Sequence, residues 1–160
     1  MNRGEVQVLR DYLGHFRRTF ARQCEGLDAE QLARRAVPPS SMSLLGLLRH
    51  LAGVEHSWWR RVMDRRLDLP RMWGKDEHPD ADFDGAVADD AVVAEAWEAW
   101  RREVAYAELW EADHAMDHLG QHDDGEVEMR EVVVHLIEEY ARHCGHADLL
   151  RECIDGRTGL

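Results

Sequence analysis

The chain has 160 residues, 44% of them hydrophobic, and a formal net charge of −12 with histidines neutral. This length suits one domain, taken as residues 1–160, and is short for two. The negative charge argues against nucleic acid or an anionic membrane as the main partner, and no stretch approaches the roughly 20 apolar residues of a membrane-spanning helix. The amino terminus lacks the apolar segment of a signal peptide, so we expect a cytoplasmic protein.

Apolar residues recur at three- and four-residue steps in the first half of the chain, which predicts two amphipathic helices. The first helix covers residues 4–24, and Asp28 is placed to cap a short helical turn after it. The prolines at 38 and 39 then force an extended connection. Either Ser41 or Ser43 caps the second helix, which we expect to end near Leu67.

The second half of the chain predicts two more helices. A long loop over residues 68–90, rich in aspartate, leads to a helix over 89–111. Residues 112–127 form a turn-rich connection before a last helix over 128–153. Four long amphipathic helices indicate an all-α fold, an up-down four-helix bundle with long loops between helices. The three cysteines, Cys24, Cys144 and Cys153, form no CxxC pair and are expected to be free thiols.

The last helix carries a candidate metal site. Glu139 and His143 are four residues apart, so both side chains lie on one helix face one turn apart. His50, which interrupts the leucine-rich face of the second helix, is the best candidate for a third ligand. Two histidines and one glutamate form a ligand set used for catalytic zinc, in which the fourth position stays open.

Other interpretations of these residues stay open at this stage. Glu139 can form a surface ion pair with Arg142 or His143, and His50 can be a packing residue. His135 and His146, each one turn away along the same helix, compete for a place in the site. The HExxH motif of zinc proteases is absent.

A rival metal site consists of three histidines spaced four and four. His114, His118 and His122 would line one face of a continuous helix. However, Gly120 lies among them and Asp123 and the residues after it mark a turn, so we expect a solvated, histidine-rich connection instead.

Two segments carry a family resemblance. Residues 49–59, from Arg49 to Trp59, resemble the second-helix motif of DinB-like proteins, and residues 134–156 resemble the last helix of one branch of that family. The family fold is a four-helix bundle that holds a divalent metal with one ligand from the second helix and two from the fourth. Glu139 stands where many members have a first histidine, and His143 matches the second. A glutamate at the first position occurs in the mycothiol-dependent maleylpyruvate isomerase relatives. The resemblance therefore implies the same three ligands, His50, Glu139 and His143.

The resemblance also implies a function. Characterised relatives are bacillithiol or mycothiol S-transferases and isomerases, in which a zinc or nickel ion would activate a low-molecular-weight thiol that attacks a small electrophile. Arg49 or Arg142 would receive a carboxylate of the thiol, and the 68–90 loop with Trp73 would cover the cleft. The alternatives are a non-catalytic metal-binding stress-response or dimeric interaction protein and a purely structural bundle. The six tryptophans and the long apolar stripes favour a homodimer.

Overall fold

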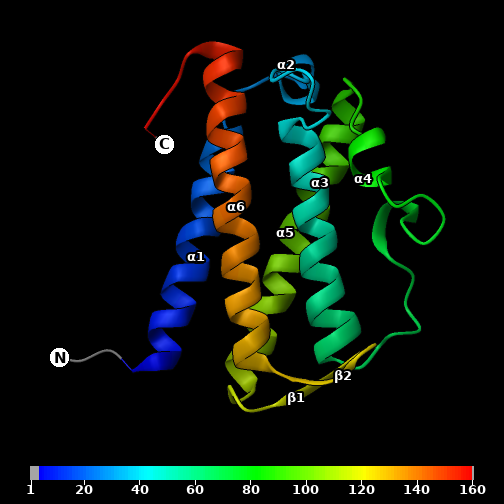
Figure 1. Cartoon of the computed structure of the whole chain (residues 1–160), viewed down its shortest axis with the longest axis vertical. Coiled ribbons are helices and arrows are strands. Elements are labelled where there is room, and N and C mark those ends of the chain that lie inside the picture. The colour runs from blue at the N-terminus through cyan, green and yellow to red at the C-terminus, as the bar shows by residue number, and fades with distance from the viewer. Residues whose placement is uncertain (1–3, 160) are drawn as a thin grey trace.

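The computed structural model describes residues 4–159, and the protein is mainly helical (Figure 1). Residues 1–3, at the terminus expected to lack a signal peptide, and residue 160 lie outside this description. Four long helical segments lie side by side, joined by shorter elements. The long segments are α1 (Glu5–Cys24), α3 (Leu44–Glu55) with its continuation η1 (His56–Met63), α5 (Asp90–Asp113) and α6 (Met129–Asp155), and the short ones are α2 (Ala29–Ala33), η2 (Met72–Gly74), α4 (Ala81–Asp84), β1 (Leu119–His122) and β2 (Gly125–Glu128).

The helix starts follow the capping chemistry of the sequence. The side chain of Ser43, one of the two predicted caps, accepts a hydrogen bond of 3.0 Å from the backbone N–H of Gly46. Asp28 caps α2 as predicted, through the backbone N–H of Gln31. At the other end of the chain, Gly156 in the left-handed conformation terminates α6.

The second helix differs from the prediction at its carboxyl end. It stops at Met63 rather than near Leu67, and its last eight residues form a π-helix. Arg65 then adopts a positive φ of 54°, which turns the chain out of the helix. A π-helical segment offsets the side chains that follow it relative to an α-helix, and such segments occur frequently at functional sites.

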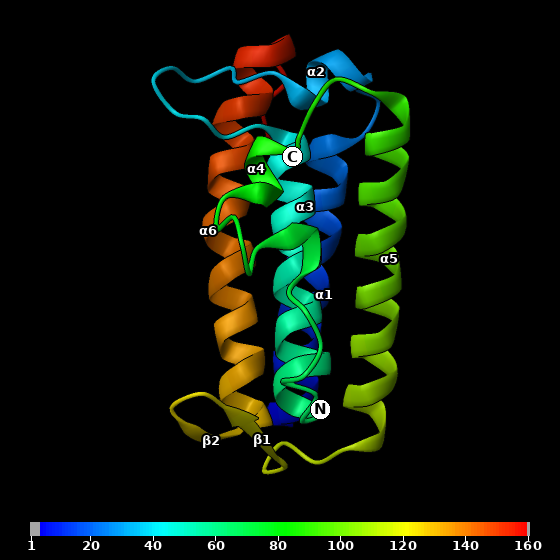
Figure 2. The same cartoon turned by 90° about the vertical axis from the view of Figure 1, so that its right-hand side faces the viewer.

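The order of helix directions also differs from simple up-down alternation. Figures 1 and 2 show α3 and α5 running in the same direction, opposite to α1 and α6. The residues between Met63 and α5 make this parallel course of α3 and α5 possible, because they run back along α3 before α5 begins. They contain η2 and α4, so the predicted long loop is partly helical.

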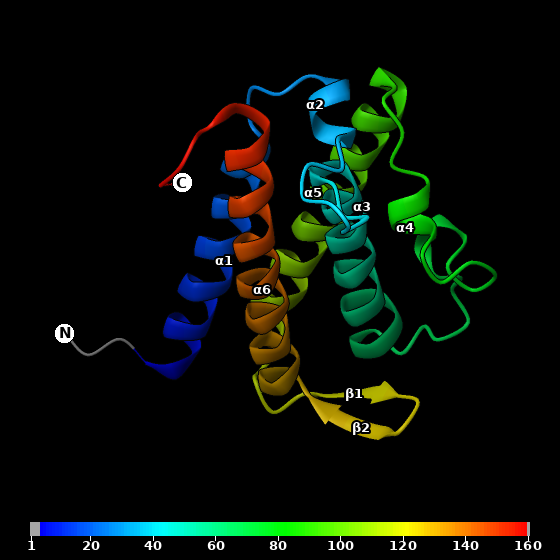
Figure 3. The same ribbon diagram turned by 45° about the horizontal axis from the view of Figure 1, so that its top comes forward.

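Within the described residues, the predicted all-α fold has one exception, a β-hairpin in the turn-rich connection. Strands β1 and β2 pair antiparallel, with Leu119 opposite Glu128 and His122 opposite Gly125. Figure 3 shows the hairpin at one end of α6. Gly120 allows it to approach η1 closely, since an added Cβ there would lie 2.8 Å from Met63 Sδ and 2.9 Å from the carbonyl oxygen of Val62.

The core lies between the long helices, where leucines of α3 pack with Trp59, Leu136 and Tyr140. Fully burying a side chain of this size contributes about 1.5–3 kcal/mol. Within residues 4–159, no helix is both long and apolar enough to cross a membrane.

The core also contains a charged network. Glu55, which is fully buried, accepts hydrogen bonds from Arg17 Nε at 2.7 Å and Nη2 at 2.8 Å, and from the Tyr140 hydroxyl at 2.7 Å. The Trp100 indole N–H donates to the same hydroxyl at 2.8 Å. The four side chains come from the four long helical segments, so the network ties them together.

Candidate metal centre

His50, Glu139 and His143 lie together, with one potential ligand atom from each side chain within 4.8 Å of the others. His50 comes from α3, and the other two come from adjacent turns of α6. Glu139 Oε2 lies 3.3 Å from His143 Nε2 and 3.7 Å from His50 Nε2. The three side chains are 10–22% exposed, so the group is sheltered and remains open to solvent on one side.

The distances fit a single divalent cation. Metal–ligand bonds of 2.0–2.1 Å in tetrahedral geometry place neighbouring ligand atoms about 3.3 Å apart. Two of the three separations, 3.3 and 3.7 Å, are close to this value, and all three ligand atoms lie within 4.8 Å of one another. Because three side chains supply ligand atoms, a tetrahedral ion would keep one position open.

The contact of His50 Nδ1 with Asp82 determines the protonation state of the nitrogen that faces the group. Its Nδ1 lies 2.9 Å from the carboxylate of Asp82, which can only accept a hydrogen bond when ionised, so Nδ1 carries a proton. In the neutral ring, Nε2 then presents a lone pair to the Glu139 carboxylate. The lone pair and the carboxylate repel each other unless a proton or a metal cation lies between them, and the arrangement therefore favours a cation.

The pKa values of the group follow from the same contacts. Hydrogen bonds from His143 and then from His50 hold the pKa of Glu139 well below its usual range. Burial opposes protonation of His50, but hydrogen bonds to Asp82 and Glu139 outweigh it and raise the pKa of His50. Without a metal, a proton on the imidazole supplies the positive charge that the carboxylates require.

Asp82 is a site residue that the sequence does not reveal. It is buried in α4, and besides His50 it accepts a hydrogen bond of 2.6 Å from Lys75 Nζ. A carboxylate behind a ligand histidine orients the ring and increases its basicity. No periodicity distinguishes Asp82 from the other aspartates of this connection, so only the folded chain identifies it.

The competing histidines of α6 lie around the group. His146 Nδ1 is 3.2 Å from His143 Nδ1, on the side of that ring away from Glu139. His135 Nε2 is 3.5 Å from Glu139 Oε1, the second carboxylate oxygen. Neither belongs to the three-residue group. Among residues 4–159, no ion pair joins Glu139 to Arg142, which is exposed.

The rival histidine site does not form within the described residues. His114 stacks on Trp110 with ring centroids 3.6 Å apart, and His118 packs against both rings. His122 is instead on β1, stacked on Trp58 at 5.4 Å. The hairpin that replaces a helix here separates it from the other two.

The two predicted thiol-binding arginines, Arg49 and Arg142, have different surroundings, and Arg142 is exposed. Arg49 is buried and donates hydrogen bonds of 2.8 and 3.2 Å to the backbone carbonyls of Asp82 and Ala81, with its guanidinium 4.1 Å from the Trp73 ring centroid. Its visible role is to hold α4 and η2 on α3. Trp73, expected to cover the cleft, donates a hydrogen bond of 2.7 Å to the carbonyl of Arg49.

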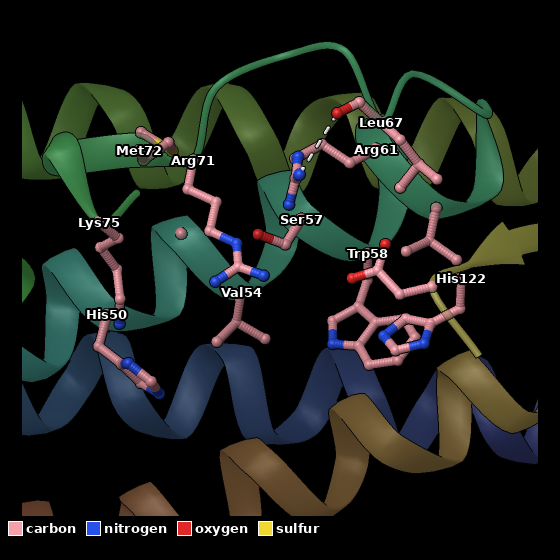
Figure 4. Close-up of a pocket in the computed structure, with 13 residues that line it drawn as sticks. His50, Val54, Ser57, Trp58, Arg61, Leu67, Arg71, Met72, Lys75 and His122 are labelled. Carbon is pink, nitrogen blue, oxygen red and sulfur yellow. Dashed lines mark hydrogen bonds between the residues drawn. The ribbon is translucent and has the colours of Figure 1, made fainter. Parts of the chain in front are cut away.

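A pocket of about 240 Å³ adjoins the group and shares His50 with it (Figure 4). Its walls come from α3 and η1, from the chain around η2, and from the tip of the hairpin. The lining residues are His50, Gly53, Val54, Ser57, Trp58, Arg61, Val62, Leu67, Arg71, Met72, Lys75, His122 and Asp123. Sequence reasoning located only His50 among them, because the others converge through the π-helix, the connection and the hairpin.

The fold and the grouped ligands describe a helical protein with a candidate metal centre. A family model described as "Mycothiol-S-transferase" matches residues 8–156, nearly the whole chain. The chain therefore belongs to the mycothiol S-transferase family, within the DinB-like proteins that its sequence resembles. No curated protein and no solved structure matches it.

Proposed function

We propose that this protein is a metal-dependent thiol S-transferase with a DinB-like bundle formed by its single domain. His50, Glu139 and His143 would hold one divalent cation, zinc in preference to nickel, and the partners would be a mycothiol-type thiol and a small electrophile. The observation that carries the proposal is the Glu139 oxygen 3.3 and 3.7 Å from two imidazole nitrogens, in a chain of this family.

A bound cation would lower the pKa of a coordinated thiol, so that the nucleophilic thiolate forms near neutral pH. The residues of the chain prepare the site for that chemistry. Asp82 holds His50 Nδ1 and leaves Nε2 directed at the group. His146 contacts the outer nitrogen of His143, and the position not filled by side chains is left for the sulfur.

The activity is tested with 1-chloro-2,4-dinitrobenzene and mycothiol on zinc-loaded protein. The sulfur forms a bond to the ring carbon, chloride leaves with the electron pair of the C–Cl bond, and the thiol proton passes to solvent. We expect catalysed thioether formation that His143→Ala abolishes. His15→Ala is the control, since it removes an exposed histidine of α1 that lies outside the three-residue group and the pocket.

The outcome also separates this proposal from the alternatives. Stoichiometric metal without thiol consumption, for any electrophile tried, would favour a non-catalytic metal-binding protein. A protein with neither metal binding nor thiol consumption would be a purely structural bundle. We also propose that the protein forms a homodimer, which sedimentation at several concentrations tests directly.

A further inference from the structure

We propose that the pocket beside His50 holds the electrophile and selects one that carries a carboxylate next to a small apolar or aromatic body. The inference rests on the proposed S-transferase function and adds the chemical class of its second substrate. Arg61 and Arg71 would bind the carboxylate, and Trp58, Val54 and Met72 would contact the apolar part.

The first observation is an uncompensated positive charge in a strongly acidic protein. The Arg61 side chain is half-buried and donates from Nε to the carbonyl of Leu69 at 2.9 Å and from Nη2 to that of Leu67 at 3.4 Å. Carbonyl groups do not neutralise a guanidinium. Within residues 4–159, no carboxylate pairs with Arg61 at 4.0 Å or less, although the chain carries a net charge of −12.

The second observation is a further guanidinium that has only a loose partner. Arg71 Nε lies 3.8 Å from an oxygen of Asp76, beyond hydrogen-bond distance, and both side chains are about half exposed. Figure 4 shows the Arg71 side chain extending toward Ser57 and Val54, in the part of the pocket where Arg61 also points. Two planar guanidinium groups suit the bidentate recognition of a carboxylate.

The other charged groups of the pocket do not supply this site. Lys75 is already paired with Asp82 at 2.6 Å, so its charge is compensated. Asp123, which follows β1, lines the hairpin wall together with His122. An anionic ligand is therefore directed to Arg61 and Arg71 and away from the hairpin tip.

The third observation is a fixed aromatic surface. Trp58 is stacked on His122 with a centroid distance of 5.4 Å and an interplanar angle of 12°, and contacts His135 at 4.7 Å. Contacts on two sides hold the indole in place, so little side-chain entropy is lost when a ligand packs on it. Val54 and Met72 add further apolar surface.

The pocket is also the right size and in the right place for a small second substrate. A volume of about 240 Å³ is below the roughly 300–1,000 Å³ of sites for drug-sized ligands. His50 belongs both to the pocket wall and to the metal-ligand group. A ligand held by its carboxylate at Arg61 and Arg71 would therefore have its reactive carbon on the side of the pocket that adjoins the thiol sulfur proposed to bind at the metal centre.

Binding is measured first, on protein freed of metal by chelation, so that no ion can attract the carboxylate. Phenylacetate and its neutral analogue phenylacetamide are titrated by calorimetry. We expect phenylacetate to bind at least about tenfold more tightly, and Arg71→Gln to abolish most of this difference. Arg65→Gln is the control, since Arg65 pairs with Glu126 at 2.9 Å and does not line the pocket.

Arg61→Gln is the second variant, and because Arg61 also holds the carbonyls of Leu67 and Leu69, its folding is checked first. Equal binding of the two probes, or a preference that survives in Arg71→Gln, overturns the inference. This result is independent of transferase activity, so a failure of the pocket and a failure of the proposed function are distinguishable.

Kinetics provide the second measurement, with 4-chloro-3-nitrobenzoate and its amide as electrophiles. In both, the sulfur displaces chloride, and the thiol proton passes to solvent. We expect a higher kcat/KM for the acid, lowered about tenfold in Arg71→Gln mainly through KM, with the amide unaffected. Equal loss for both electrophiles would contradict a carboxylate-binding role.

Discussion

Two polar clusters share the same pair of helical segments and differ in how completely their groups are paired. In the core cluster, both oxygens of Glu55 receive hydrogen bonds of 2.7–2.8 Å from Arg17, and one also receives the Tyr140 hydroxyl. In the metal-ligand group, Glu139 Oε2 faces two imidazole nitrogens at 3.3 and 3.7 Å. Tyr140 and Glu139 are neighbours on α6, so adjacent residues of one helix serve the two clusters.

The difference in pairing indicates a different role for each cluster. The core cluster has a donor for each oxygen of its carboxylate, and its burial leaves no room for a ligand. The metal-ligand group has converging acceptors, a partly open side and a carboxylate behind one imidazole. A closed network stabilises the fold, whereas converging acceptors favour a proton or a metal cation between them.

Breaking the core cluster should have the largest effect on stability. Glu55→Ala leaves the buried Arg17 guanidinium without its carboxylate and removes the acceptor of the Tyr140 hydroxyl. We expect the free energy of unfolding to fall by about 3–5 kcal/mol in urea titrations at neutral pH. A loss below 1 kcal/mol would show that the cluster is not a major stabilising feature.

Glu111, which lies beside Arg17 of the core cluster, should make the free energy of unfolding depend on pH. Burial raises the pKa of Glu111 to about 7, because Arg17 lies 3.6 Å away, too far for a hydrogen bond that would compensate. The folded state then binds this proton more tightly than the unfolded state, so its contribution to stability is lost as pH rises from about 4.5 toward 7.

The variant Glu111→Gln isolates that contribution. We expect the difference in free energy of unfolding between wild type and variant to change by about 1–3 kcal/mol across this pH interval, as measured by urea titrations at several pH values. Glu98→Gln on the same helix is a control at an exposed position. A difference that does not vary with pH would contradict a raised pKa for Glu111.

A smaller effect is expected when the support of a metal ligand is weakened. Asp82→Asn keeps the side-chain shape and removes the negative charge that holds His50 Nδ1 and Lys75. We expect the protein to bind zinc about 10–100-fold more weakly, without losing the one-to-one stoichiometry. Competition with a chromophoric chelator measures this affinity, and an unchanged value would remove Asp82 from the site.

The grouping of Glu139 with His143 could be predicted from the sequence because their spacing is local. A four-residue step on a helix places Glu139 beside His143, and the leucine-rich face around His50 directs that residue inward. The four long helices and the Ser43 cap follow equally from periodicity and capping.

Other features depend on tertiary structure. The parallel course of α3 and α5 depends on a connection long enough to run back along α3, and residue patterns do not specify that path. The π-helix offsets Trp58 and Arg61 toward the pocket without a signal in the sequence. For the hairpin a signal existed, since Asp123, Asp124 and Gly125 are common turn residues, although the observed two-residue turn is Asp123–Asp124 and the flanking residues do not alternate clearly.

The most direct test of the account is zinc binding by metal-free wild type, Glu139→Gln and His135→Ala, measured by titration calorimetry. We predict one zinc ion per chain for wild type and His135→Ala, and no stoichiometric binding by Glu139→Gln. The free energy of unfolding of each protein is measured without metal, so that a loss of zinc binding is not confused with a loss of folding. Unchanged zinc binding by Glu139→Gln, or none by wild type, would contradict the metal centre.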